Sequence, residues 1–275
     1  MNTKKLYYWS ITVALAGFLF GFDTIVISGA EQDIQRLWGS YTLFGSNDLF
    51  HGIVIVGAAL WGTVLGAIFG AIPNDRLGRK KTLVFIGVLY TISAIGSSMA
   101  SDPWIFALFR FIGGIGVGAS TIAAPSFISE IAPQEKRGRL VATYQFNIVF
   151  GILIAFVSNA LLAKYISNDA WRWMIGIEAL PAIIYTVMMF AIPESPRWLF
   201  LNHKKEEAAK VLKKLNSAEE ALVVQIEIEN SLHEEDKNQW KHLVHPTFKK
   251  ALFVGIGLSI LQQLTGINAI LYYAP

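Results

Sequence analysis

Seven apolar stretches, each long enough to cross a lipid bilayer, limit what this chain can fold into. They lie at roughly 8–30, 51–72, 82–100, 105–126, 141–163, 173–192 and 250–275. A helix of about 20 apolar residues crosses the hydrocarbon layer, which is about 30 Å thick. The stretches are continuous rather than alternating, which favours helices over the strands of a membrane barrel. The sequence therefore predicts an all-α membrane protein.

The composition agrees with this fold class and narrows the function. Hydrophobic residues make up 53% of the chain and charged residues 16%, whereas a soluble domain carries about 25% charged residues. The chain has no cysteine, so it has neither disulfides nor thiolate chemistry. It also has no nucleotide-binding loop, nucleophile constellation or catalytic carboxylate pair, and its net charge of +3 does not indicate nucleic-acid binding. We expect a protein that is not an enzyme and has no cofactor.

Two further features of the sequence have simple interpretations. Lys4 and Lys5 precede the first apolar stretch, as in a signal peptide, but the stretch is long and lacks a small-x-small cleavage site. We therefore expect an uncleaved first helix. His242 and His245 lack a cluster of further metal ligands, and we interpret them as part of a solvated loop rather than a metal site.

Lysine and arginine in short connections predict the orientation in the membrane. Nine lie in the N-terminal segment and in the second-to-third and fourth-to-fifth connections: Lys4, Lys5, Arg76, Arg79, Lys80, Lys81, Lys136, Arg137 and Arg139. The alternate connections hold three: Arg36, Lys164 and Arg172. This bias predicts a multi-pass protein of the inner or plasma membrane whose N-terminus is cytoplasmic. Three tryptophans near the ends of apolar stretches read as interfacial anchors: Trp171, Trp173 and Trp198.

The order of apolar and polar segments predicts three regions. Residues 1–193 should form a six-helix bundle, residues 194–249 a cytoplasmic linker, and residues 250–275 the first helix of an incomplete second bundle. The linker shows a helical stripe of Ala208, Val211, Leu212 and Leu215. Ser217 with Glu220 reads as a capping box that opens a second short helix. We expect both helices to pack under the bundle.

Asp23 is the most informative polar residue of the apolar stretches. It lies in an otherwise uncharged run from Leu6 to Ala30. A charge at that depth costs about 2.5–3.5 kcal/mol on insertion scales, so an intramembrane acid is a functional-site hypothesis by default. Amides occur in later stretches, at Gln145, Gln262, Gln263 and Asn268. Amides both donate and accept hydrogen bonds without carrying a charge. Together with Asp23 and the basic loops, they indicate a proton-coupled carrier of a polar solute.

Glycines at a spacing of four predict close helix contacts. Gly62, Gly66 and Gly70 share one face of the second stretch, and Gly114 and Gly118 one face of the fourth. Gly266 follows the Gln262–Gln263 pair and predicts a break in the seventh helix.

Three charged motifs lie at the predicted cytoplasmic helix ends. Their charged and turn residues are Asp75, Arg76, Gly78, Arg79, Glu130, Arg137, Glu194 and Arg197. One interpretation is that they only set topology and cap helices. The alternative is an ion-pair network that holds a cytoplasmic gate in one conformation, since a shielded network biases an equilibrium more than isolated surface pairs do.

These motifs resemble those of a known family across nearly the whole chain. Residues 75–80 (DRLGRK) are similar to the loop signature of the major facilitator superfamily, and 110–118 (RFIGGIGVG), 193–199 (PESPRWL) and 262–273 (QQLTGINAILYY) resemble sugar porter motifs. The resemblance is to bacterial proton-coupled sugar symporters of the xylose type and to glucose facilitators. Ala71, Pro73 and Phe127 depart from the family pattern without removing a charge. The resemblance implies the N-terminal six-helix half of the major facilitator fold plus a seventh helix.

The resemblance also implies roles for particular residues. Those expected to bind or line the sugar site are Phe20, Gln145, Ile148, Ile152, Gln262, Gln263, Asn268 and Tyr272. Asp23 stands where symporters have an acid and facilitators an uncharged residue, and Arg110 is its expected partner in proton coupling. Ile152 stands where facilitators have isoleucine, which leaves the choice of pentose or hexose open. For the amides the alternative is interhelical hydrogen bonding, and for Asp23 a static ion pair.

The sequence thus predicts a proton-coupled symporter of a pentose or hexose that works by alternating access and is monomeric at full length. Its partners would be a monosaccharide, protons and the lipid bilayer. A facilitative uniporter, a sugar sensor without flux and an inactive truncated fragment are the alternatives. We expect that residues 1–275 alone do not transport.

Overall fold

The computed structural model describes residues 2–166, 168–233, 246–267 and 270. Within these residues it contains helices and no strand, which confirms the predicted fold class. Six helical segments are long and apolar enough to cross a membrane: Thr3–Leu37, Asn47–Phe69, Arg79–Met99, Pro103–Ile131, Gln134–Tyr165 and Ala170–Phe190. They match the first six predicted stretches, most of them extended by polar turns at the ends.

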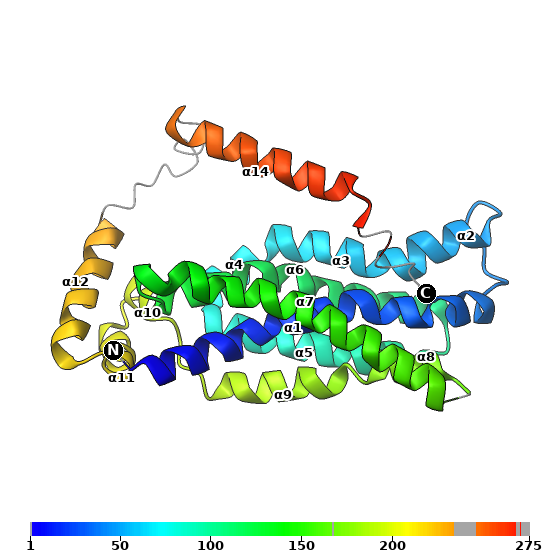
Figure 1. Ribbon diagram of the computed structural model, residues 1–275, viewed down its shortest axis with the longest axis horizontal. Helices are drawn as coiled ribbons and strands as arrows, with labels where there is room; N and C mark the ends of the chain where they lie inside the picture. Colours follow the sequence, from blue (N-terminus) through cyan, green and yellow to red (C-terminus); the bar gives the residue numbers. More distant parts are fainter. Residues whose placement is uncertain (1, 167, 234–245, 268–269, 271–275) are drawn as a thin grey trace.

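The helices follow one another with short connections. Their bounds are α1 (Thr3–Leu37), α2 (Asn47–Phe50), the π-helix η1 (His51–Val56), α3 (Gly57–Phe69), α4 (Ala71–Leu77), α5 (Arg79–Met99), α6 (Pro103–Ile131), α7 (Gln134–Tyr165), α8 (Ala170–Gly176), α9 (Ala179–Phe190), α10 (Pro196–Leu201), α11 (Lys205–Leu215), α12 (Ala218–His233) and α14 (Pro246–Leu264). The helices α10, α11 and α12 lie at one end of the bundle, which we call the linker end; α2 and α8 lie at the opposite, distal end (Figure 1).

Local chemistry explains where the helices begin. The Asp102 carboxylate caps α6 by accepting from the amides of Trp104 and Ile105 at 2.8 and 3.3 Å, and Pro103 occupies the first turn. These are the residues expected at a helix start, because the first amides lack partners and proline has no N–H to leave unpaired. The predicted capping box is confirmed: Ser217 N–H donates to Glu220 at 3.1 Å, and Glu220 N–H donates to Ser217 Oγ at 3.3 Å.

The bundle is built around two closely packed helix pairs, α1 with α7 and α3 with α6, while α5 packs between α6 and α9. The predicted glycine contacts are confirmed. A Cβ on Gly62 would meet the carbonyl of Phe111, and a Cβ on Gly114 would meet the carbonyl of Ala59. Small residues on both helices therefore let the α3 and α6 backbones touch. Close packing of this kind drives helix association in lipid, where the hydrophobic effect does not.

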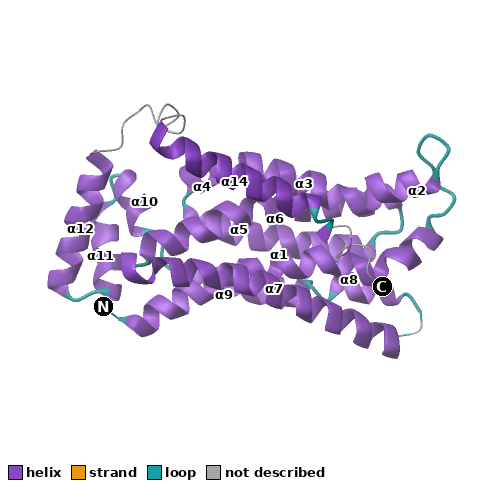
Figure 2. Cartoon of the chain, turned by 45° about the horizontal axis from the view of Figure 1, so that its top comes forward, coloured by secondary structure: helices purple, strands orange, loops and turns teal. Residues whose placement is uncertain are grey.

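The linker helices cover one end of the bundle (Figure 2). Their predicted stripe, Ala208 to Leu215, is buried and belongs to the same apolar cluster as Trp198 and Leu199 of α10 and Leu6 of α1. The α11 carbonyl of Leu215 also accepts from the amide of Asn2. The linker is thus packed against the bundle as expected.

Two of the three tryptophans are not interfacial anchors. Trp173 is 62% exposed, but Trp171 and Trp198 are 3% and 6% exposed. Trp171 packs edge-on against Trp38 and Phe106, and the Trp198 indole donates to the carbonyl of Asp75 at 2.7 Å. The position of a tryptophan near a helix end does not reveal whether it packs inside the protein or anchors it in the membrane. In the fold, neighbouring residues cover the rings of Trp171 and Trp198.

Candidate functional site: a buried charge cluster and a charged end

Asp23 and Arg110 form a buried ion pair at the centre of the bundle. Asp23 lies on α1 and Arg110 on α6, with side chains 3% and 1% exposed. Arg110 Nη1 donates to Asp23 Oδ1 at 2.5 Å, and Nη2 donates to the Asp23 carbonyl at 3.2 Å. The structure therefore brings together the two residues expected to take part in proton coupling. Removing one partner of such a pair typically costs about 3–5 kcal/mol, because the other charge stays buried without compensation.

A second acid, Glu178, lies beside this pair and was not among the expected site residues. It precedes α9, is 1% exposed and interacts with both Asp23 and Arg110. Neither carboxylate oxygen has a well-formed hydrogen bond among the described residues. The signal was present in the sequence, since Glu178 is the sole charged residue of the stretch 173–192, the criterion that singled out Asp23.

The cluster therefore holds two carboxyl groups and one guanidinium in a dry environment. With both acids ionised its net charge is −1, and with one proton bound it is neutral. A buried net charge is unfavourable, whereas a neutral, hydrogen-bonded cluster is tolerated. Chemically, this arrangement can hold one proton shared between Asp23 and Glu178. It can release that proton when water enters or Arg110 moves, because both changes can favour the ionised carboxylates.

The expected sugar-site residues of the bundle lie on the α1–α7 pair. Phe20 on α1 and Ile148 and Ile152 on α7 are half-buried, and Gln145 on α7 is exposed. The two helices approach closely, since a Cβ on Gly21 would meet the carbonyl of Ile148 and one on Gly151 that of Phe18. Three apolar residues and one exposed amide, that of Gln145, thus lie on one helix pair.

The structure does not bring Gln262 and Gln263 to this pair. Gln262 and Gln263 are exposed on α14, which lies apart from the bundle (Figure 1). The helix ends at Leu264, and Gly266 follows with φ +70°, a conformation that glycine adopts without strain and that fits the predicted break. Asn268, Tyr272, His242 and His245 lie outside the described residues.

At the linker end, the charged motifs converge on Arg79 and Glu130. Arg79 Nη2 lies 2.9 Å from Glu130 Oε1 and Nη1 lies 3.3 Å from Asp75 Oδ1. The hydroxyl of Ser195 donates to the second Glu130 oxygen. The three motifs are therefore connected, and Glu130 pairs with Arg79 rather than with its sequence neighbour Arg137. Arg76 is exposed on α4.

Glu194 supplies the helix cap that α5 lacks. Gly78 at the start of α5 has φ +98° and no side chain to cap with. The carboxylate of Glu194 accepts from the amides of Lys80 and Ser195, each at 2.9 Å. A Cβ at residue 78 would clash with this carboxylate, so glycine is needed both for the backbone angle and for the approach of Glu194. Burial raises the pKa of Glu194, and the amide hydrogen bonds partly oppose this.

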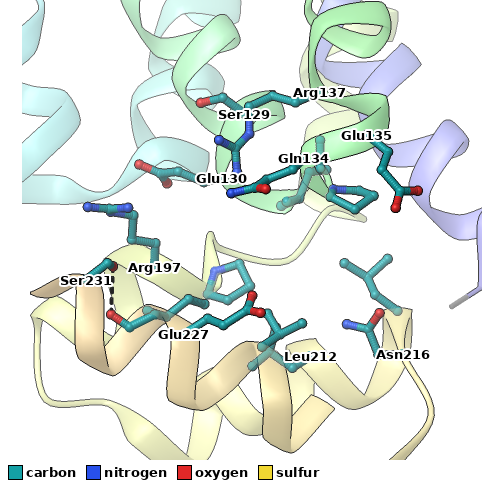
Figure 3. A pocket seen from close by; sticks show the side chains of 17 residues that line it. Ser129, Glu130, Gln134, Glu135, Arg137, Arg197, Leu212, Asn216, Glu227 and Ser231 are labelled. Atoms are coloured by element: carbon teal, nitrogen blue, oxygen red, sulfur yellow. Dashed lines mark hydrogen bonds between the residues drawn. The ribbon is translucent and has the colours of Figure 1, made fainter. Parts of the chain in front are cut away.

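A cavity of about 680 Å³ separates the ends of α6 and α7 from the linker helices. Figure 3 shows Glu130, Gln134 and Arg137 on the bundle side and Arg197 and Glu227 on the linker side. Charged residues of both signs, from two of the three motifs and from α12, therefore face one open space at this end.

The comparisons with known proteins agree with this geometry. Residues 9–275 match the family model described as "Sugar (and other) transporter". The chain is 38% identical to the major myo-inositol transporter IolT of Bacillus subtilis, over 94% of this chain and 54% of that protein. It is 40% identical to the glucose transport protein of a Synechocystis species, over 99% and 59%. It is 34% identical to the D-xylose-proton symporter of Escherichia coli, over 100% and 61%. The chain therefore spans a little over half the length of these relatives.

Solved structures show the same likeness. The partially occluded inward open form of the xylose transporter XylE from E. coli superposes with a TM-score of 0.88 at 32% identity, covering 99% of this chain and 65% of that one. The proton:xylose symporter XylE bound to 6-bromo-6-deoxy-D-glucose gives a TM-score of 0.85 at 31% identity, covering 100% and 62%. The protein is thus a multi-pass membrane protein with the fold of a transporter and not of an enzyme. By its sequence and its fold, the chain belongs to the sugar transporter family of the major facilitator superfamily.

Proposed function

We propose that the protein carries a monosaccharide across the inner or plasma membrane by alternating access and that a proton moves with the sugar. Family membership supports the class of activity, and the proton-coupled xylose transporter among its relatives supports the coupling. The chain spans only part of its relatives' length, so the proposal concerns a protein of the relatives' full length that contains these residues. Its N-terminus and its linker end lie in the cytoplasm, as the distribution of lysine and arginine indicates.

The buried cluster of Asp23, Arg110 and Glu178 carries the proposal. A facilitator needs no ionisable group that changes its charge, and an acid at this depth is costly unless it has a function. With three ionisable groups, the cluster is neutral only when one proton is bound. Closing the site around the cluster therefore favours proton binding, and opening it to the cytoplasm hydrates the carboxylates and favours release.

The sugar would bind between the bundle's α1–α7 pair and the segment that begins at α14. Gln145, Gln262, Gln263 and Asn268 would exchange hydrogen bonds with sugar hydroxyls, and Phe20, Ile148, Ile152 and Tyr272 would pack against the ring. Mid-membrane sites next to interrupted helices are a recurring feature of secondary transporters. At the cytoplasmic end, the network of Arg79, Glu130 and Glu194 would hold one conformation of the gate and separate in the other.

Uptake into proteoliposomes tests the coupling. With an imposed pH gradient, the wild-type protein should accumulate a labelled sugar from a panel of xylose, glucose and myo-inositol above its equilibrium level. Asp23→Asn and Glu178→Gln should each abolish accumulation, because one acid with Arg110 is neutral without a proton. Both variants should retain sugar-for-sugar exchange. Asn and Gln keep a hydrogen-bond acceptor beside Arg110, which limits the loss of stability.

Asp33→Asn is the matched control, because Asp33 is an exposed acid on the same helix, 3.9 Å from Arg36. It should accumulate sugar as the wild-type protein does. Undiminished accumulation in both cluster variants would remove the cluster from the coupling role. A wild-type protein that equilibrates sugar regardless of the pH gradient would be a facilitative uniporter, and one that binds sugar without flux would be a sensor.

A further inference from the structure

A second buried acid–base pair lies in the bundle, apart from the Asp23 cluster. His51 is the first residue of η1, and its Nε2 atom lies 3.3 Å from Glu31 Oε1 on α1. The two side chains are 5% and 14% exposed. Glu31 is eight residues beyond Asp23 on α1, a rise of about 12 Å, so the two sites are separate. The pair joins the first two membrane-spanning segments toward the distal end.

Few other ionisable groups face this pair. Asp48 on α2 is a further charge that acts on His51, and the amide of Gln35 donates to its carboxylate at 2.9 Å. Of the other elements packed against η1, α3 has no ionisable side chain, and α6 has only Arg110, paired with Asp23, and Glu130 at the linker end. Asp102 caps α6. Burial therefore has the largest effect on the protonation of His51, followed by Glu31 and then Asp48.

We propose that His51 and Glu31 form a second proton-binding site, whose occupancy by one proton keeps α1 and η1 together at the distal end. Buried, the pair is neutral only with one proton, either as imidazolium and carboxylate or as imidazole and carboxylic acid. In water, glutamate and histidine have ordinary pKa values of about 4.3 and 6.5, so a separated pair keeps one proton between these values and loses it above. Separation above about pH 6.5 therefore releases a proton, and rising pH favours it. Asp48 strengthens this dependence, because its negative charge opposes proton loss from the closed pair.

The local backbone is suited to such a rearrangement. Residues 51–56 form a π-helix between the α-helices α2 and α3. A π-turn is a rare and irregular segment that occurs often at functional sites. A change of a single turn here would move His51 relative to Glu31 without disturbing the glycine contact between α3 and α6. The site goes beyond the proposed transport, because it would gate the distal end in a symporter and in a uniporter alike.

A thiol-accessibility experiment tests the proposal independently of proton-coupled transport. The chain has no cysteine, so Ile34→Cys introduces a reporter at a position that is 0% exposed and lies in the apolar cluster around Phe50 and Ile55. Its rate of modification is divided by that of Leu49→Cys, an exposed site (46%) at the same end, which cancels the pH dependence of the reagent. All proteins carry Asp23→Asn, so that the coupling cluster does not contribute.

The relative rate should rise between pH 6 and pH 8, by at most about tenfold per pH unit, as the linkage of one proton allows. His51→Gln should abolish this rise, and Glu31→Gln should do so too, which keeps the proposal testable if one variant fails to fold. His203→Gln, at an exposed histidine of the linker end, should leave the rise unchanged. A flat wild-type profile, or an equal rise in both pair variants, would overturn the proposal. Neither result would touch the coupling role of Asp23, which the uptake experiment decides.

Discussion

At the scale of single residues, the polar groups of this protein differ in how their burial is compensated. Arg110 compensates Asp23 directly through two hydrogen bonds. Glu194 is compensated by backbone amides at the start of α5. Glu178 interacts electrostatically with Asp23 and Arg110 but has no well-formed hydrogen bond among the described residues. A buried group whose hydrogen bonds are incomplete is a candidate for a change of protonation, because a fully hydrogen-bonded buried group would lose bonds by changing.

The shifted pKa of Glu194 gives a pH dependence that can be measured at the linker end. Because burial raises this pKa in the folded protein, the folded state favours the protonated acid. That contribution to stability is complete below the ordinary pKa of glutamate and is lost as pH rises through the raised value.

Thermal unfolding of the wild-type protein and of Glu194→Gln between pH 4 and pH 8 checks this. The stability of the wild-type protein relative to the variant should fall as pH rises above about 4.3. Glu135→Gln, which removes an exposed acid at the same end, controls for the loss of a charge. A difference between wild type and Glu194→Gln that stays constant or grows with pH would contradict the prediction.

At the scale of elements, backbone contact between α3 and α6 fixes the arrangement of the bundle. Glycines alternate across this pair, so each backbone fits against the other. Dispersion between closely packed backbones replaces the hydrophobic effect in lipid, and an added methyl group has no void to occupy. The same logic holds α1 against α7 at Gly21 and Gly151.

Gly66→Ala should therefore destabilise the bundle. Its Cβ would lie 3.0 Å from the Ala119 nitrogen and closer to the carbonyl of Ile115, and overpacking of this kind costs about 1–3 kcal/mol. The melting temperature in detergent should fall. Gly138→Ala is the control, since nothing lies within 4 Å of its Cβ and alanine favours a helix. Equal melting temperatures for the two variants would show that the close contact at Gly66 does not determine the stability of the bundle.

At the scale of the whole molecule, the described residues form one packed bundle with its linker and one helix that stands apart. Apart from Gly257, the described side chains of α14 from residue 252 to 264 are exposed. A helix that is apolar on all sides and unpacked needs further protein or lipid around it. The expected sugar contacts are accordingly divided between the bundle and α14.

We expect that liposomes containing only residues 1–275 show no sugar uptake above that of empty liposomes, because Gln262 and Gln263 are exposed on α14 rather than packed against the bundle. A protein of the relatives' full length that contains these residues, reconstituted at equal density, should show uptake. Sugar-specific, saturable uptake by residues 1–275 would contradict this expectation and would mean that a working cavity forms without further helices.

The long apolar helices could be predicted from the sequence because they depend on local information. Run length gave the first six membrane-spanning segments, and the spacing of small residues gave the faces of α3 and α6 that touch. The Ser217–Glu220 cap was equally local. The sequence also contained the signal for Glu178, an acid alone in an apolar stretch.

Only the tertiary structure decided which distant residues meet. Glu194 caps a helix that begins 115 residues earlier, at Arg79, and Trp198 donates to the Asp75 carbonyl rather than facing the membrane interface. Glu178 joins Asp23 and Arg110, and His51 meets Glu31. Periodicity identifies the face of a helix on which a residue lies, but not the helix that will cover it. That depends on how the helices cross, and the crossing is set by contacts along the whole length of each pair.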